Sequence, residues 1–223
     1  MGNFNIQLIL IYAIPVLFAI TLHEVAHGYV ASKLGDNTAA MLGRLSLNPI
    51  KHIDPVGTVL VPLLLFFMGG FIFGWAKPVP INWRNLKNPK RDMALVAVAG
   101  PAANLVMAIF WGVLAKIAIS LYATSPEAAT IIYQMGWAGV MINIALLVLN
   151  MIPIPPLDGS RVVTSFLPYD MAVKYNKLER WGFFILLALL IIPVGNGNLL
   201  WYIMGPFMQF FIGIIGHSLS ISG

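Results

Sequence analysis

Long apolar runs alternate with short polar segments along almost the whole chain. A helix that spans a lipid bilayer needs about 20 mostly apolar residues. Five runs are candidates for such helices: residues 6–30, 93–122, 131–152, 181–194 and 199–217. The run at 181–194 is short as bounded and must extend back toward Leu178 to span. No Lys or Arg precedes the first run, so it lacks the basic start of a signal peptide and we interpret it as a retained helix.

Two further segments break this pattern. Residues 56–75 are apolar but contain Pro62 and the pair Gly69-Gly70, which disfavour an uninterrupted helix, so this run is expected to enter the membrane and return. Residues 41–47 alternate partly between apolar and polar and end at Asn48-Pro49, which is typical either of a short strand or hairpin or of an ordinary polar loop.

These patterns predict an all-α polytopic membrane protein with five or six membrane helices, a re-entrant apolar segment and a small β-hairpin near the functional site. We expect a single integral-membrane domain over residues 1–223. Its core would occupy about residues 6–161, and additional C-terminal helices would occupy about 162–223.

Composition supports a membrane protein and narrows the chemistry. Hydrophobic residues make up 59% of the chain and charged residues 9%, too few charges to cover a soluble fold. The net charge is +5, but the basic residues lie in short gaps between apolar runs, which favours loops at an anionic membrane surface over nucleic-acid binding. The chain has no cysteine, so a metal would have to be held by histidine, carboxylate or water.

The most specific motif is His23-Glu24-Val25-Ala26-His27 in the first run. Residues four apart lie on nearly the same helical face, so both imidazoles can reach one zinc ion while Glu24 lies beside the water it binds. Ionisable groups inside a membrane helix cost free energy unless they are paired or wetted, and a metal is one such partner. The alternative is that these side chains hydrogen-bond between helices.

A catalytic zinc needs a third protein ligand, and Asp158 is the favoured candidate over His52, His217 and the other carboxylates. Asp158 follows Pro153, Pro155 and Pro156, which end a helix and impose an extended segment near the membrane boundary. Extended backbone at that depth is tolerated only where it is buried in protein or faces water. Taken alone, the segment is also compatible with a plain helix-terminating loop.

The two motifs together resemble the site-2 protease family of intramembrane zinc metalloproteases. The later motif matches as Asn150, Pro153, Pro155, Asp158 and Gly159, and residues 74–80 and 99–104 also resemble short bacterial and archaeal members. The resemblance covers most of the chain up to about residue 161. The chain has no room for the PDZ or CBS modules that the family often carries.

The resemblance implies a role for each matching residue. His23, His27 and Asp158 would ligate Zn²⁺, Glu24 would be the catalytic base, and Asn150 would help to hold the substrate backbone. The substrate would be a transmembrane protein or peptide cleaved within or near its membrane segment. We interpret Asn104 as an interhelical packing or hydrogen-bonding residue.

Topology tests this site. Six full crossings would place His27 and Asp158 on opposite faces of the membrane, whereas a re-entrant run at 56–75 places both on one face. The re-entrant arrangement also collects twelve of the thirteen Lys and Arg residues on one side, against a nine-to-three split for six crossings. The positive-inside bias therefore favours re-entry, with basic loops in the cytoplasm of what we expect to be a prokaryotic cell.

Two other functions remain open at this point. A transporter or channel would also use broken helices and buried ionisable residues to bind an ion. A catalytically silent relative that only binds membrane partners would keep the helices and have no need of Glu24. The substrate, the triggering signal, the oligomeric state and any need for prior cleavage are not encoded in recognisable motifs.

Overall fold

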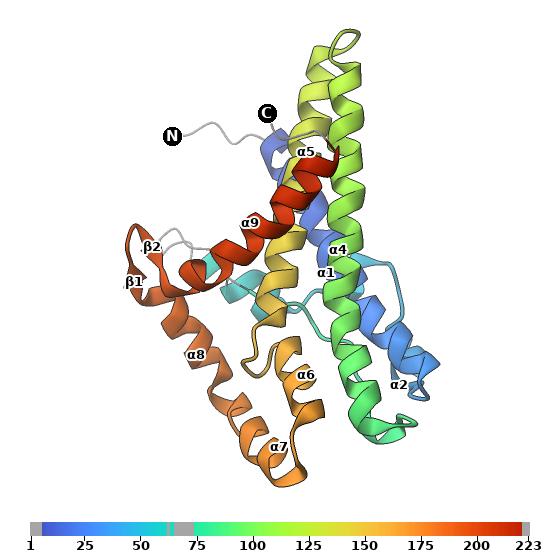
Figure 1. Ribbon diagram of the computed structural model, residues 1–223. Helices are drawn as coiled ribbons and strands as arrows, with labels where there is room; N and C mark the ends of the chain where they lie inside the picture. Colours follow the sequence, from blue (N-terminus) through green and yellow to red (C-terminus); the bar gives the residue numbers. More distant parts are fainter. Residues whose placement is uncertain (1–5, 62, 65–73, 220–223) are drawn as a thin grey trace.

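The computed structural model describes residues 6–61, 63–64 and 74–219, and most of them are helical (Figure 1). Within these described ranges, four helices are long and apolar enough to cross a membrane: α1 (Ile6–Lys33), α4 (Pro89–Leu121), α5 (Pro126–Met151) and α9 (Leu199–Leu219). The run at 181–194 forms α8 (Glu179–Ile191), whose 13 residues fall short of the roughly 20 needed to span. The chain is an integral membrane protein built from helices, as the apolar pattern predicts.

Short elements connect the long helices. They are α2 (Thr38–Met41), the 3-10 helices η1 (Pro49–His52) and η3 (Trp83–Asn85), the π-helix η2 (Pro55–Leu60), α6 (Asp158–Phe166) and α7 (Tyr169–Asn176). Figure 1 shows α2 and α7 gathered at the same end of the molecule as the start of α4.

Helices α4 and α5 form an antiparallel pair at the centre of the fold, and α1 packs against both (Figure 1). Small residues allow this close contact: a Cβ added at Gly136 would lie 2.8 Å from the backbone of Trp111 and of Ala115. Close backbone approach through small residues is the usual way for helices to associate in lipid. The pair therefore provides a rigid support for the polar residues of α1.

The described ends of the 56–75 run meet. The Trp75 N–H donates to the Gly57 carbonyl at 3.0 Å, and the Thr58 hydroxyl donates to the Trp75 carbonyl at 2.8 Å. A full crossing would separate the two ends by about the 30 Å thickness of the hydrocarbon core. The contact therefore supports a run that returns, although residue 62 and residues 65–73 lie outside the described part.

The hairpin is present, but not where the alternation at 41–47 suggested it. Strand β1 (Pro193–Val194) pairs antiparallel with β2 (Gly197–Asn198) between α8 and α9, and Gly195 takes a positive φ of 57° in the turn. Residues 41–47 instead form the end of α2, a turn and a loop, so the strand alternative for this segment is wrong.

Side-chain hydrogen bonds, and not a ladder of backbone hydrogen bonds, fix the 41–47 loop. The Arg44 Nη2 donates to the Lys77 carbonyl at 3.0 Å, and His52 Nε2 bonds the Ser46 carbonyl at 2.8 Å. These contacts fix the loop against residues 77–78 without a ladder of backbone hydrogen bonds. The partial alternation of the sequence does not distinguish such a loop from a strand.

Candidate metal centre

His23 and His27 lie side by side on one face of α1, as their four-residue spacing predicts. Both side chains are buried, and their Nε2 atoms are 3.0 Å apart. The rings meet edge to face with centroids 4.6 Å apart. One helix therefore presents two nitrogen ligands to a single point.

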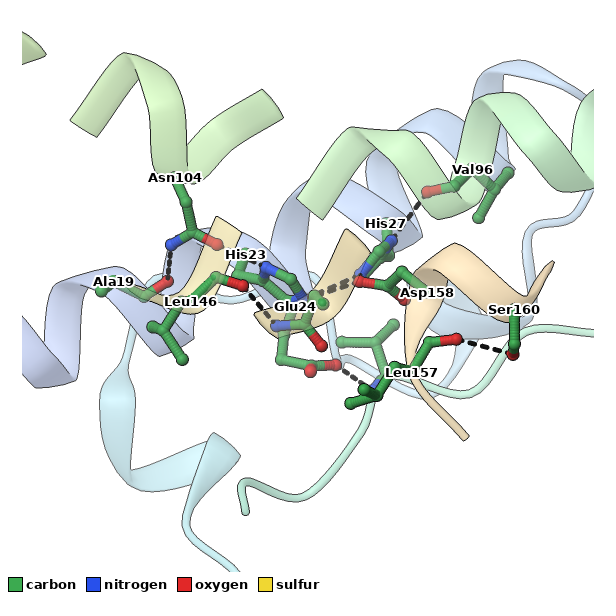
Figure 2. A network of polar contacts seen from close by, with 12 residues as sticks. Ala19, His23, Glu24, His27, Val96, Asn104, Leu146, Leu157, Asp158 and Ser160 are labelled. Carbon is green, nitrogen blue, oxygen red and sulfur yellow. Dashed lines mark hydrogen bonds and ion pairs between the residues drawn. The ribbon is translucent and has the colours of Figure 1, made fainter. Parts of the chain in front are cut away.

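Asp158 reaches the same point from the other half of the chain (Figure 2). Helix α5 ends at Met151, before Pro153, and α6 begins with Asp158. The Asp158 Oδ2 atom lies 3.2 Å from His23 Nε2 and 3.3 Å from His27 Nε2. The three predicted ligands thus converge. Among the described residues they form a group whose ligand atoms all lie within 4.8 Å of one another, close enough to hold one metal ion.

The segment that carries Asp158 to the histidines is braced by α7 and α8. The Tyr175 hydroxyl of α7 donates to the Pro153 carbonyl at 2.6 Å, and burial raises the pKa of Tyr175. A Cβ added at Gly182 of α8 would lie 2.1 Å from the Pro155 carbonyl oxygen, so only glycine permits this packing. The predicted extended segment is therefore held by the helices that follow it.

The outer nitrogens of the two imidazoles show which atoms face the centre. His27 Nδ1 bonds the Val96 carbonyl at 2.7 Å, and His23 Nδ1 bonds the Asn104 amide oxygen at 2.6 Å (Figure 2). Both partners only accept hydrogen bonds, so each Nδ1 carries the ring proton and each Nε2 presents a lone pair. Within the described residues, the buried Oδ2 of Asp158 likewise has no hydrogen-bond donor.

These three atoms fit a divalent metal ion. Three lone pairs that face one another without a proton between them repel, and a cation removes the repulsion. Ligand atoms about 2.1 Å from a tetrahedral ion lie roughly 3.4 Å apart, close to the 3.0, 3.2 and 3.3 Å observed here. Two imidazoles and one carboxylate would leave a fourth position open, as catalytic zinc sites require.

Glu24 lies beside the ligand group without joining it. Its Oε2 accepts a hydrogen bond of 2.7 Å from the Val79 backbone N–H. With His23 it lines a cavity of about 580 Å³ whose remaining walls are mostly apolar side chains of α1, α5, α8 and residues 74–76 and 156–157. A carboxylate fixed by one oxygen at the edge of a cavity is suited to act as a general base.

Asn150 also lines this cavity, where the predicted substrate contact requires it. Its Nδ2 donates to the Leu146 carbonyl one turn back along α5 at 3.0 Å. The other two histidines lie outside the ligand group: His52 is buried in η1, and His217 lies in the last turn of α9.

The sequence did not reveal three contributors to the centre. They are the Val96 carbonyl, the Val79 N–H and Gly100, at which an added Cβ would lie 2.3 Å from His27 Nε2. Gly100 and Asn104 belong to the segment 99–104 that resembles short family members, which was the available signal. Asn104 makes interhelical hydrogen bonds, as interpreted, and one of them is to a metal-site histidine.

Fold and site together define a polytopic α-helical membrane protein with a two-histidine, one-aspartate centre beside a glutamate. The family model described as Peptidase family M50 matches residues 112–193. A Bacillus subtilis protein named "Putative zinc metalloprotease YwhC" is 38% identical over 198 residues, which cover 88% of this chain and 84% of that protein. The Mycolicibacterium smegmatis protein named "Putative zinc metalloprotease Rip2" is 32% identical over 182 residues, covering 81% and 66%.

No solved structure matches the chain significantly. The likeness to the curated relatives extends over most of the chain. This chain belongs to peptidase family M50.

Proposed function

We propose that this protein is an intramembrane zinc endopeptidase that cleaves peptide bonds within or near the transmembrane segments of other proteins. The observation that carries the proposal is the convergence of His23 and His27, from the candidate membrane span α1, with Asp158 at the start of α6, beside Glu24. The names of the relatives, which describe zinc metalloproteases, support the choice of zinc.

The chain's own residues have distinct roles in this mechanism. His23, His27 and Asp158 would hold a zinc ion, which when bound would supply Lewis-acid chemistry to a water molecule and to the scissile carbonyl. Glu24 takes a proton from the attacking water and delivers it to the leaving amine. The Val79 N–H holds one Glu24 oxygen, which keeps the carboxylate turned toward the cavity.

The substrate is a peptide segment that enters the cavity from the bilayer. A transmembrane helix satisfies its own backbone hydrogen bonds, so the segment must unwind locally before cleavage. The Asn150 amide then orients the unwound backbone. The apolar cavity walls suit hydrophobic side chains on either side of the cleaved bond.

The orientation in the membrane follows from the loops. The centre lies toward the end of the molecule that carries the basic residues, and these loops face the cytoplasm of a prokaryotic cell. Nucleic acid is not a partner in this proposal, because the cations are spread over membrane-boundary loops.

The substitution Glu24→Gln tests the catalytic role. It keeps the side-chain shape and the acceptor for Val79 but removes the base, so metal content should stay unchanged while peptide hydrolysis falls by about 10² to 10⁴-fold. Membrane fractions of cells that express the wild type or the variant are compared by mass spectrometry to find peptide fragments that are present only with the wild type. The membrane segment from which such a fragment comes is then tested as a substrate of the purified protein. Full cleavage by the variant would refute the assignment.

Asp158→Ala is the matched comparison. It removes a ligand instead of the base, so both metal content and hydrolysis should fall. If Asp158→Ala retains metal as tightly as the wild type, the ligand assignment is wrong even if Glu24 proves essential.

A further inference from the structure

We propose that Asn104 is a positioning residue that fixes which nitrogen His23 turns toward the metal, an inference that rests on the metal site proposed above. Asn104 and Asn143 are both completely buried amides in membrane-spanning helices. Burying an amide in an apolar environment is costly unless its hydrogen bonds are satisfied. Here the two amides form a chain that ends at His23.

The chain of hydrogen bonds starts at two backbone carbonyls. The Asn143 Nδ2 donates to the Gly139 carbonyl of α5 at 2.8 Å, which turns the Asn143 Oδ1 toward α4. The Asn104 Nδ2 donates to that Oδ1 at 3.0 Å. It also donates to the Ala19 carbonyl of α1 at 3.3 Å (Figure 2). Backbone carbonyls cannot donate, so neither amide can rotate by half a turn without placing its oxygen against another oxygen.

The fixed amide determines the tautomer of His23. With its Nδ2 committed to two acceptors, Asn104 can present only its oxygen to His23 Nδ1, 2.6 Å away. That oxygen requires the ring proton on Nδ1, which leaves the Nε2 lone pair directed at Asp158 and His27. A ring with its proton on Nε2 would point N–H at the metal position and could not be a ligand there.

His27 provides an internal comparison. Its Nδ1 is bonded to the Val96 backbone carbonyl, which no side-chain substitution removes. The tautomer of His23 therefore depends on a side chain, whereas that of His27 depends on the main chain. A change at Asn104 should alter one histidine and leave the other as it is.

The test reads the ring nitrogens directly. Protein labelled with ¹⁵N-histidine is purified in detergent, stripped of metal and studied by NMR at roughly pH 8.5, where ordinary imidazoles are neutral. The chain has only 4 histidines, which simplifies assignment with a His23→Gln variant. In the wild type, Nδ1 of both His23 and His27 should carry a proton.

Two substitutions separate positioning from general packing. In Asn104→Leu the His23 proton should move wholly or partly to Nε2, His27 should not change, and zinc affinity measured by chelator competition should fall about 10 to 100-fold. In Asn143→Leu the Ala19 carbonyl still orients Asn104, so the His23 tautomer and zinc affinity should stay close to wild type.

Three results would overturn the proposal. They are an unprotonated Nδ1 on His23 in the wild type, no change of tautomer or affinity in Asn104→Leu, and equal losses in the two variants. None of these measurements depends on peptide cleavage. A protein that binds zinc through a correctly oriented His23 but cleaves nothing would refute the protease function and leave the role of Asn104 intact.

Discussion

The metal centre depends on Gly100 because glycine has no side chain. It lies on α4, one turn before Asn104, and both imidazoles pack against its backbone: an added Cβ would be 2.3 Å from His27 Nε2 and 2.6 Å from His23 Cε1. Small residues in membrane helices usually serve helix contact. At this position the space is filled by metal ligands instead.

Gly100→Ala is therefore expected to weaken zinc binding by at least about tenfold, because the methyl group must displace a ligand ring. The substitution favours the helix itself by about 1 kcal/mol, so the protein should remain folded. Zinc content and thermal unfolding of the purified variant measure the two effects separately.

The control is Gly205→Ala in α9, where nothing lies within 4 Å of an added Cβ. It makes the same change of helix propensity away from the centre and should leave zinc binding unaltered. Unchanged zinc affinity in Gly100→Ala would show that the rings can move aside at no cost to metal binding.

Among the elements, the end of α1 is tied to the segment after Val79, the residue whose N–H bonds Glu24. Asp36 lies just after α1 and accepts hydrogen bonds from the Asn82 N–H at 2.7 Å, the Asn85 amide at 2.9 Å and the Thr38 N–H at 3.1 Å. These bonds hold residues 82–85 against α1, three residues beyond the Val79 N–H that bonds Glu24. A buried carboxylate here fixes the segment that contains the short 3-10 helix η3.

Asp36 also predicts a pH dependence of stability. Burial raises the pKa of this carboxyl, but the hydrogen bonds from Thr38, Asn85 and Asn82 outweigh burial and hold the pKa below its ordinary value. A lowered folded-state pKa stabilises the protein above the ordinary carboxyl value of about 4, and the stabilisation is lost as pH falls through the lower folded-state value.

Asp36→Asn should thus reduce the free energy of unfolding at neutral pH by about 1–3 kcal/mol, because an amide leaves the Asn82 N–H facing a donor. The difference from wild type should shrink below about pH 4. Thermal unfolding in detergent over a pH series measures it, with the exposed Asp170→Asn as control. A difference that stays constant down to the lowest pH would contradict a role for the ionised form.

At the scale of the whole molecule, the contact between α1 and the start of α6 restricts the topology. His27 and Asp158 can meet only if an even number of crossings separates them, and α4 and α5 supply two. The meeting of Gly57 with Trp75 agrees with this count. The basic segments around α2, α6 and α7 then share one side of the membrane (Figure 1).

Single cysteines test this topology, since the natural chain has none. Lys87→Cys and Ser125→Cys replace exposed residues at opposite ends of α4. A membrane-impermeant thiol reagent should reach position 125 in intact cells and position 87 only in opened membranes. Labelling of both positions from the same side would exclude the proposed arrangement.

Local pattern was enough to determine the long helices and the pairing of His23 with His27. In lipid the backbone must satisfy its own hydrogen bonds, so the long apolar runs other than 56–75 are expected to be helices. A four-residue spacing on a helix then fixes which side chains share a face. The proline-broken segment likewise had to leave the helix before Asp158.

Tertiary structure decided everything that depends on partners remote in the chain. Asn104 lies 81 residues from the His23 it bonds, Val96 lies 69 from His27, and Val79 lies 55 from Glu24. The loop at 41–47 is fixed by Arg44 and His52 side chains, and so its alternation did not become a strand. Sequence periodicity indicates which face of its own helix or strand a residue occupies. The atom that the residue contacts on that face depends on how the helices pack.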